Sequence, residues 1–510
     1  MSGPRRRGRR RAGATASDAA AAPILQPTFD LPQYTVASEE QAELIHDVSL
    51  RILEEAGIAF YDDESLDILR QAGARVDGDS VVRLDREMVE WAIAAAPSSF
   101  QHIGRDPAHN VVVGGHHMVL APVAGPPYVS DLDGGRRNGT LADLINFIKM
   151  SNVTPRLQNQ GTEIVTPGDV PFHERALDIV YAHIRYGTKP MMGHYPIGIC
   201  ADDSVAMARI THGDDVVANN VVLLGVINVS SPRRLDDRML GTLKSYVRAG
   251  QAIILTPFVL AGAMGPAAIL GTVAQANAEA LATLTFAQIV KPGAPCVYGP
   301  FLASVDLQSG SPVMGSAESL LSQSLCAQMA RRYDMPFRAA GGYVSSKVPD
   351  AQTGVETVMS MLPSMMSKPN FVLHAAGWME NGLTTSYEKF ALDLELLGIL
   401  LRLVRGVSWD DGEWALDSVL TDVPPGGHHL GTAHTMGRFR EAFHRTDFFD
   451  HDSFEQWQAA GSRDSAVRAN ASWKALLERW EDPGLDDAVD AELQDYMARR
   501  RTEIDPAEFQ

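Results

Sequence analysis

The sequence predicts an α/β fold whose centre is a closed (β/α)8 barrel, a TIM barrel, over residues 118–404. Two observations lead to this prediction. Apolar runs of strand length alternate eight times with stretches of helical periodicity, and the repeating region has about the length that this barrel needs. We expect an α+β extension before the barrel, at residues 37–117, and a mostly helical extension after it, at residues 405–510.

The eight apolar runs are short and uninterrupted. They occupy residues 118–125, 157–165, 190–198, 221–229, 252–262, 295–305, 336–344 and 371–379. Runs without polar alternation suit strands that are covered on both faces, as in a parallel sheet. An open doubly wound sheet is the alternative, but no G-x-G-x-x-G follows the first run and no phosphate-binding G-x-x-x-x-G-K-[ST] is present.

Helical periodicity follows several of the runs. It is clearest in residues 140–151, 173–187, 238–250, 317–333 and 387–404. In the fourth of these stretches Leu321, Leu325 and Met329 are spaced i, i+4 and i+8, which predicts an apolar face that packs on the sheet. The helix expected at the start of the 37–117 extension should bury Leu44, Val48 and Ile52 in the same way.

Composition and charge narrow the function classes. The formal net charge of -19 argues against a nucleic-acid-binding surface, because such a surface must neutralise phosphates. Residues 1–36 are expected to be a disordered tail and linker, with six arginines in residues 1–22 and no secretory apolar stretch. The uncharged stretch 249–278 is interrupted by Pro257 and Pro266, so we expect a buried strand, a turn and a helix start there, with no membrane span.

Three cysteines lie far apart along the chain, which favours reduced thiols in the cytoplasm. His428, His429 and His434 lie close together, but they lack a zinc-binding pattern, and no metal site is predicted. The sequence leaves open whether the chain forms a homo-oligomer.

The residues that follow the apolar runs are the candidate site, because the carboxyl ends of barrel strands meet at one face. The candidate substrate-binding residues are Tyr128, Glu163, His194, Tyr195, Phe258, Tyr298, Phe301, Tyr343, Lys347, His374, Trp378 and Glu380. Aromatic residues make up 7% of the chain, yet six of the eight positions carry at least one. Such a set predicts an aromatic cage for an organic cation, although rings that merely plug the barrel mouth are the alternative.

Two other functions stay open at this point. A lyase or hydrolase would use Glu163, Asp306, His374 and Glu380 for acid-base chemistry. A sensor would bind a quaternary amine without catalysis. A Schiff base on Lys347 is disfavoured because polar neighbours surround it and such a lysine needs an apolar pocket.

Four segments, at residues 160–171, 186–193, 345–356 and 426–457, resemble the trimethylamine methyltransferase family. The likeness extends over roughly residues 40–460. It implies a barrel that gives a methyl group from an amine to the cobalt of a separate corrinoid protein, with no cofactor bound by this chain itself.

The founders of that family carry pyrrolysine, whereas this chain has standard residues throughout, including 341–347, the best match to that position. Members without pyrrolysine look like demethylases of quaternary amines such as glycine betaine. The resemblance therefore implies a small quaternary amine as substrate. If the amine carries a carboxylate, we expect Lys347, His374 or His194 to pair with it. No residue is assigned as a catalytic acid or base.

Overall fold

The computed structural model describes residues 26–509. The arginine-rich part of the predicted tail, residues 1–25, lies outside the described residues. Residues 26–36, expected as a linker, pack on the body of the protein. The Phe29 side chain is buried, and the Gln26 side-chain amide donates to the Val112 carbonyl oxygen at 2.6 Å.

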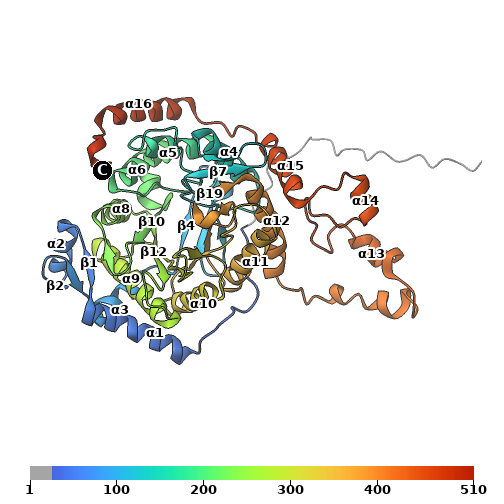
Figure 1. Cartoon of the computed structure of the whole chain (residues 1–510), viewed down its shortest axis with the longest axis horizontal. Helices are drawn as coiled ribbons and strands as arrows, with labels where there is room; N and C mark the ends of the chain where they lie inside the picture. The colour runs from blue at the N-terminus through green and yellow to red at the C-terminus, as the bar shows by residue number, and fades with distance from the viewer. Residues whose placement is uncertain (1–25, 510) are drawn as a thin grey trace, which may run out of the picture.

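A closed barrel lies at the centre of the molecule (Figure 1). Within residues 26–509 its regular strands are β6 (Val119–Leu120), β9 (Met191–Met192), β10 (Leu223–Val229), β12 (Ala252–Ala261), β13 (Cys296–Tyr298), β16 (Arg338–Ala340) and β17 (Phe371–Leu373). Pairing is parallel from β9 through β10 and β12 to β13, and from β16 through β17 back to β6. A parallel bridge between Tyr298 and Phe337 joins the two halves.

The second apolar run fills the remaining place in the barrel without forming a regular strand. Its backbone still bonds to both neighbours: the Gln158 amide donates to the Leu120 carbonyl oxygen at 3.0 Å, and the Gln160 amide donates to the Pro190 carbonyl oxygen at 3.0 Å. The Asn159 side chain accepts from the Gly161 amide, which turns the chain locally. All eight predicted runs thus take part in the barrel, and the predicted fold is confirmed.

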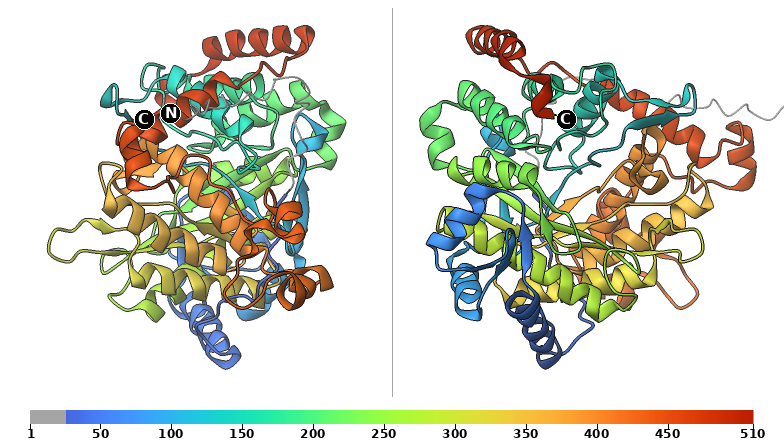
Figure 2. Two further views of the ribbon diagram at one scale, coloured as in Figure 1. Left: turned by 90° about the vertical axis from the view of Figure 1, so that its right-hand side faces the viewer. Right: turned by 60° about the vertical axis from the view of Figure 1, so that its left-hand side comes forward.

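Helices surround the strands (Figures 1 and 2). They are α4 (Leu141–Val153), α5 (Arg175–Tyr186), α6 (Gly198–His212), α7 (Asp214–Asn219), α8 (Asp237–Arg248), α9 (Ile269–Val290), α10 (Ala317–Arg332), α11 (Ala351–Met366) and α12 (Tyr387–Val404). Polar caps begin several of them: Thr140, Asp236, Ser316 and Asp350 each accept from a backbone amide of the first turn. The uncharged stretch 249–278 forms β12, a turn and the start of α9, as predicted. Within residues 26–509 no helix is long and apolar enough to cross a membrane.

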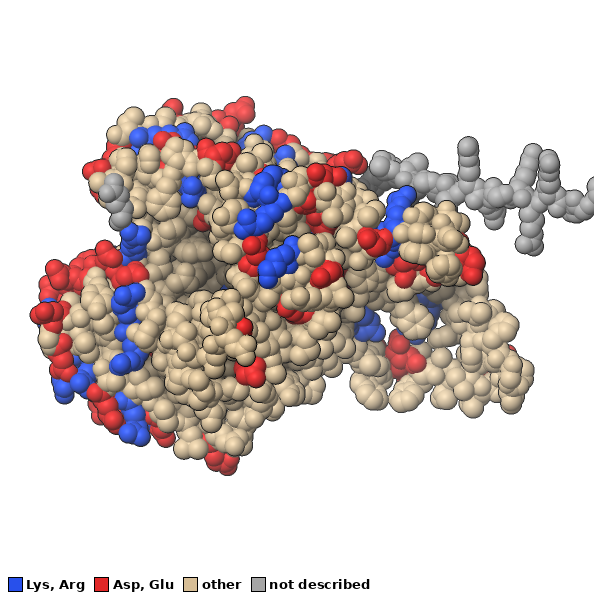
Figure 3. Space-filling view, in the orientation of Figure 1, with Lys and Arg blue, Asp and Glu red and all other residues tan. Residues whose placement is uncertain are grey.

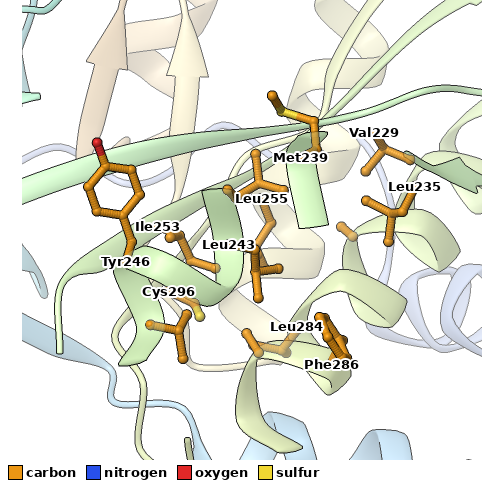
Figure 4. Close-up of a cluster of buried hydrophobic side chains, with 14 of the residues drawn as sticks. Val229, Leu235, Met239, Leu243, Tyr246, Ile253, Leu255, Leu284, Phe286 and Cys296 are labelled. Atoms are coloured by element: carbon orange, nitrogen blue, oxygen red, sulfur yellow. The ribbon is translucent and has the colours of Figure 1, made fainter. Parts of the chain in front are cut away.

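Alternation along the strands separates two apolar layers. In β12, Ile253 and Leu255 belong to the layer between strands and helices, where they lie near Leu243 of α8 (Figure 4). Ala252 and Ile254 belong to the cluster inside the barrel. This period of two tells which residues of a strand face the barrel interior and which face the helices.

The N-terminal extension covers one side and one end of the barrel. It contains α1 (Glu39–Arg51), β1 (Ile58–Phe60), α2 (Asp63–Gln71), β2 (Arg75–Asp77), β3 (Val81–Arg83), α3 (Arg86–Ala95), β4 (Ser99–His102) and β5 (Val111–Gly114). Strands β1 to β3 form a small sheet with β11 (Arg234–Leu235). Val111 and Val113 of β5 join the cluster inside the barrel, next to the first residues of its strands. The β4–β5 hairpin therefore closes the amino-terminal end of the barrel.

Two predicted helix faces were partly wrong. In α1 the side chains of Leu44 and Val48 are 63% and 44% exposed, because the helix turns Ile45 and Ser49 toward α9. The Ser49 hydroxyl donates to the Ala274 carbonyl oxygen of α9 at 3.0 Å, so a polar contact fixes the orientation of the helix. In α10, Leu321 is likewise exposed, while the two residues predicted to share its face are buried.

Short strands and the C-terminal extension complete the fold. The strands β7 (Tyr128–Asp131), β8 (Gly135–Asn138), β18 (Trp378–Met379) and β19 (Thr384–Ser386) form one sheet, and β14 (Phe301–Val305) pairs with β15 (Pro312–Val313). After α12 come α13 (Ala433–Arg438), α14 (Phe454–Ala459), α15 (Ser465–Glu478) and α16 (Asp487–Glu503). Helix α16 lies against α5 and α6. Residues 407–460, which we call the arm, extend outward from the barrel and contact it again at Asp447, which is ion-paired with Arg156 at 2.7 Å (Figures 1 and 2).

Candidate active site

Aromatic rings from neighbouring strand ends meet in one cluster. The Phe301 ring centroid lies 5.1 Å from that of Phe258, 5.2 Å from that of Tyr343 and 6.3 Å from that of Trp378. The His374 and Trp378 centroids are 4.5 Å apart. We call these five residues the ring cluster. Phe258 lies within β12, and the other four follow β13, β16 or β17. Sequence analysis predicted each of them, and the structure brings them together.

The rings meet at steep angles. Phe301 and Trp378 are at 90° to one another, and Tyr343 and Trp378 are at 68°. Edge-to-face contacts of this kind are favourable between aromatic rings. Phe301, His374 and Trp378 keep a small exposed area, and Phe258 is half-buried. Figure 3 shows a hollow in the surface where Figure 1 draws the barrel strands, so the barrel can be reached from solvent on this face.

The backbone after β17 is held in an uncommon conformation. His374 has φ of +66°, in the left-handed region that a non-glycine residue rarely adopts. Its Nδ1 accepts a hydrogen bond from the Ala124 amide at 3.2 Å, which fixes the ring. Gly342, with φ of +70°, lies so close that a Cβ atom would come within 2.8 Å of the His374 carbonyl oxygen. Such strained positions concentrate at functional sites, where the surroundings hold them in place.

Arg338 lies in the barrel wall beside these rings, and its side chain is 1% exposed. Its guanidinium carbon is 5.5 Å from the Phe301 ring centroid. Burial lowers the pKa of Arg338 to about 10, so the side chain remains charged at neutral pH. Burial also lowers the pKa of His374 well below its usual value, and the nearby Arg338 charge lowers it further, so His374 is neutral.

Glu163, His194 and Tyr195 lie at the next two strand ends. Burial raises the pKa of Glu163 and lowers the pKa of His194 to about 3, so this histidine is neutral as well. Burial raises the pKa of Tyr195, and charges on Glu163 and Arg338 also influence it.

Other predicted residues lie elsewhere. Tyr298 points into the helix layer, where its hydroxyl donates to Asn277 Oδ1 at 2.8 Å. Tyr128 lies under the Arg136 guanidinium, 3.6 Å from its carbon. Glu380 is ion-paired with Arg136 at 2.7 Å, and Lys347 is exposed.

Two of the four residues of the lyase or hydrolase alternative, Asp306 and Glu380, are engaged in other contacts. Asp306 is exposed in the turn after β14 and accepts from the Ser309 hydroxyl at 2.6 Å. Glu380 is neutralised by its ion pair, and burial keeps His374 uncharged. Within residues 26–509 no group of three or more His, Cys, Asp or Glu side chains is placed to hold a metal ion.

Sequence reasoning missed Arg338, although a signal for it was present. The run at residues 336–344 is apolar except for this arginine, and a charged residue in the middle of a strand that is covered on both faces is rarely there for packing alone. The prediction looked toward the carboxyl ends of the runs and passed over a charge near the start of one.

Comparison with known proteins decides between the remaining interpretations. A model of the trimethylamine methyltransferase family matches residues 5–505. The chain belongs to the trimethylamine methyltransferase family. This match confirms the resemblance noted in the sequence. The chain is a methyltransferase.

Among curated relatives, a glycine betaine methyltransferase of Desulfitobacterium hafniense is 38% identical over 93% of this chain and 98% of its own length. A proline betaine:corrinoid methyltransferase of Eubacterium limosum is 29% identical over 81% of this chain and 86% of its own length. The solved monomethylamine methyltransferase of Methanosarcina barkeri superimposes with a TM-score of 0.52 at 11% identity, over 89% of each chain. At 11% identity the superposition shows that this chain and the solved protein share a fold, and no more than that.

Proposed function

We propose that this chain moves a methyl group from a small quaternary amine to the cobalt of a separate corrinoid protein. The single observation that carries the proposal is the ring cluster, which gathers several aromatic side chains at one place in a barrel of this family. Ring faces attract a quaternary ammonium through their quadrupole, by about 0.5–2 kcal/mol each when water is excluded. The names of two relatives, which give betaines as substrates, point to the same class of amine.

The proposed reaction requires the enzyme to position the amine, and it requires no proton transfer to the leaving group. When the methyl carbon is transferred, the bonding electron pair stays on nitrogen, and the amine leaves as a neutral tertiary amine. No proton has to reach the leaving group, so the neutral His374 and His194 need not act as acids. The residues of this chain bind the amine, exclude water and orient one methyl group toward solvent, and positioning of that kind contributes up to about 7–11 kcal/mol to the barrier reduction.

The corrinoid comes from the partner, and this chain is proposed to bind none itself. Incubation of purified protein with glycine betaine and a reduced corrinoid protein should methylate the carrier and yield dimethylglycine, followed by the carrier's absorbance spectrum and by mass spectrometry. Omission of the corrinoid protein should abolish both products. Turnover without corrinoid would favour a lyase or hydrolase, and tight binding without transfer to any carrier would favour a sensor.

We also propose a cytoplasmic protein that self-associates. Cys200, Cys296 and Cys326 are all unpaired and buried, which suits a reducing compartment. The arm exposes large apolar side chains, among them Trp409 at 78% and Phe443 at 85%. Exposed apolar surface of this extent is typical of an interface, and a second copy of the chain is the partner we propose for it.

A further inference from the structure

The position of Arg338 within the barrel is unusual for a charged residue. Its neighbours Phe337 and Ala339 pack in the layer between strands and helices, so Arg338 points to the barrel interior. There it lies over Gly299 of the adjacent chain segment. A Cβ atom at Gly299 would come within 2.8 Å of Ile254 Cγ2 and within 3.1 Å of the Arg338 Cβ and Cδ atoms, so glycine leaves room for both side chains. The neighbouring segment thus accommodates this buried side chain.

The guanidinium group of Arg338 is almost without partners. Nη1 donates to the Gly299 carbonyl oxygen at 3.5 Å, the limit of a hydrogen bond, and Nε is buried with no acceptor. No Asp or Glu among residues 26–509 forms an ion pair with it. An arginine has five N–H donors, and a buried charge without a counter-ion is costly. Lys189, another buried cation, is satisfied by contrast: its ammonium group donates to three carbonyl oxygens, each at 2.6 Å.

We propose that Arg338 binds the carboxylate of the substrate, and that the substrate is therefore a zwitterion with a carboxylate close to its quaternary nitrogen. The inference rests on the proposed function, because the ring cluster must hold the ammonium end. A carboxylate matches the planar fork of a guanidinium group in two parallel hydrogen bonds. It would also supply the counter-ion that the protein does not provide.

The distance between Arg338 and the ring cluster limits the length of the substrate. Phe301 is a wall of the cluster and also lies 5.5 Å from the Arg338 guanidinium carbon. The sites for the positive and the negative end are therefore adjacent. An amine whose nitrogen and carboxylate are separated by few carbon atoms fits both at once, whereas a long spacer would have to fold back.

The same charge disfavours substrates without a carboxylate. A bare quaternary cation such as choline would place a second positive charge next to a buried guanidinium, and like charges repel strongly where water is excluded. His374, whose ring centroid lies 6.3 Å from that of Phe301, stays neutral and adds no further positive charge. Arg338 is thus expected to select betaines over choline by attraction to one and by repulsion of the other.

Calorimetric titration of glycine betaine and of choline tests this selection. In Arg338→Met the affinity for glycine betaine should fall about 10- to 150-fold, the equivalent of losing a charged hydrogen bond of about 1.5–3 kcal/mol. The affinity for choline should stay the same or rise, because the repulsion is removed. Arg338→Lys should keep part of the betaine affinity, since it keeps the charge and loses the fork. Equal losses for both ligands would overturn the proposal.

Lys347→Met is the matched variant, since it removes the same charge from an exposed position of the same strand end. A betaine-specific loss in this variant, without one in Arg338→Met, would assign the carboxylate to Lys347 and overturn the proposal.

Thermal unfolding provides a readout that does not depend on the ring cluster. Sodium acetate should raise the melting temperature of the wild-type protein and not that of Arg338→Met, with sodium chloride at equal ionic strength as reference. The acetate experiment tests the carboxylate site even if no quaternary amine binds. In that case the proposed function alone would fail. The melting temperature of Arg338→Met without ligand should not fall, because an unpaired buried charge is removed. A large fall would assign Arg338 a structural role and overturn the proposal.

Discussion

Lys389 and Asp393, one turn apart in α12, form a buried ion pair that joins two walls of the ring cluster. The Lys389 ammonium also donates to the Gly342 carbonyl oxygen at 2.9 Å, and the Asp393 carboxylate accepts from the Gly377 amide at 2.8 Å. Each glycine directly precedes a ring of the cluster, Tyr343 or Trp378. The pair thus fixes the relative position of two rings that come from different strands.

Removal of one partner of this pair should be costly. Lys389→Met leaves the buried Asp393 without its partner. Burial already raises the pKa of Asp393 to about 6 and Lys389 lowers it, so the carboxyl group must either take up a proton or remain buried and unpaired. We expect the free energy of unfolding to fall by about 3–5 kcal/mol. The double variant Lys389→Met/Asp393→Leu should recover much of that loss, because no uncompensated charge remains. Urea unfolding curves measure both. A double variant that is less stable by the sum of the two single effects would show that the pair is not coupled.

Loss of a ring should weaken every quaternary ligand alike. Tyr343→Ala and Trp378→Ala remove ring faces from the cluster, and each should reduce the affinities for glycine betaine and for choline by about 0.5–2 kcal/mol. Tyr298→Phe is the control, because that ring faces α9, outside the cluster. Calorimetric titration of both ligands compares the affinities of the two alanine variants with that of Tyr298→Phe. Unchanged affinities in both alanine variants would remove these rings from the binding site.

Buried histidines should make the protein sensitive to acid. Burial lowers the pKa of His102 and of His183 to about 4, whereas an unfolded chain titrates near 6.5. Between these values the unfolded state binds more protons, so stability decreases as the pH falls from about 6.5 to 4, by about 1.4 kcal/mol per pH unit for each histidine. His102→Gln should reduce the dependence of unfolding free energy on pH by about 1.4 kcal/mol per pH unit, the contribution of one histidine. Urea unfolding at several pH values measures this dependence. An equal dependence in the wild type and in His102→Gln would contradict the assignment.

The arm should mediate self-association. Leu420 and Leu430 are 73% and 77% exposed, so Leu420→Glu and Leu430→Glu should cost little in a monomer and should disrupt an apolar interface. Sedimentation velocity should show a wild-type oligomer at micromolar concentration and a monomer for the double variant. Unchanged circular dichroism would control for folding. A wild-type monomer at that concentration would contradict the prediction.

The sequence by itself determined the barrel, because eight apolar runs without alternation have few other arrangements, and barrel topology then requires their carboxyl ends to converge. For the same reason the ring cluster was predictable from chain order alone: Phe258, Phe301, Tyr343, His374 and Trp378 all lie within such runs. The family, too, was recognisable from local segments of the chain.

Only the tertiary structure decided which side of an element faces inward. Tyr298 and Phe301 lie three residues apart at one strand end, yet the first joins the helix layer and the second the ring cluster. Periodicity likewise misplaced Leu44, because a polar contact from Ser49 sets the orientation of α1.

The same limit applies to charge. Arg338 lies in β16 and Lys347 lies after it. In the sequence the two residues look like similar cations. Whether a cation is hydrated or is buried without a counter-ion depends on groups from other strands, such as Gly299 and Phe301, which only folding brings beside it. The cost of burying a charge is a property of its surroundings in three dimensions, so the group that we propose as the carboxylate receptor became visible only in the folded chain.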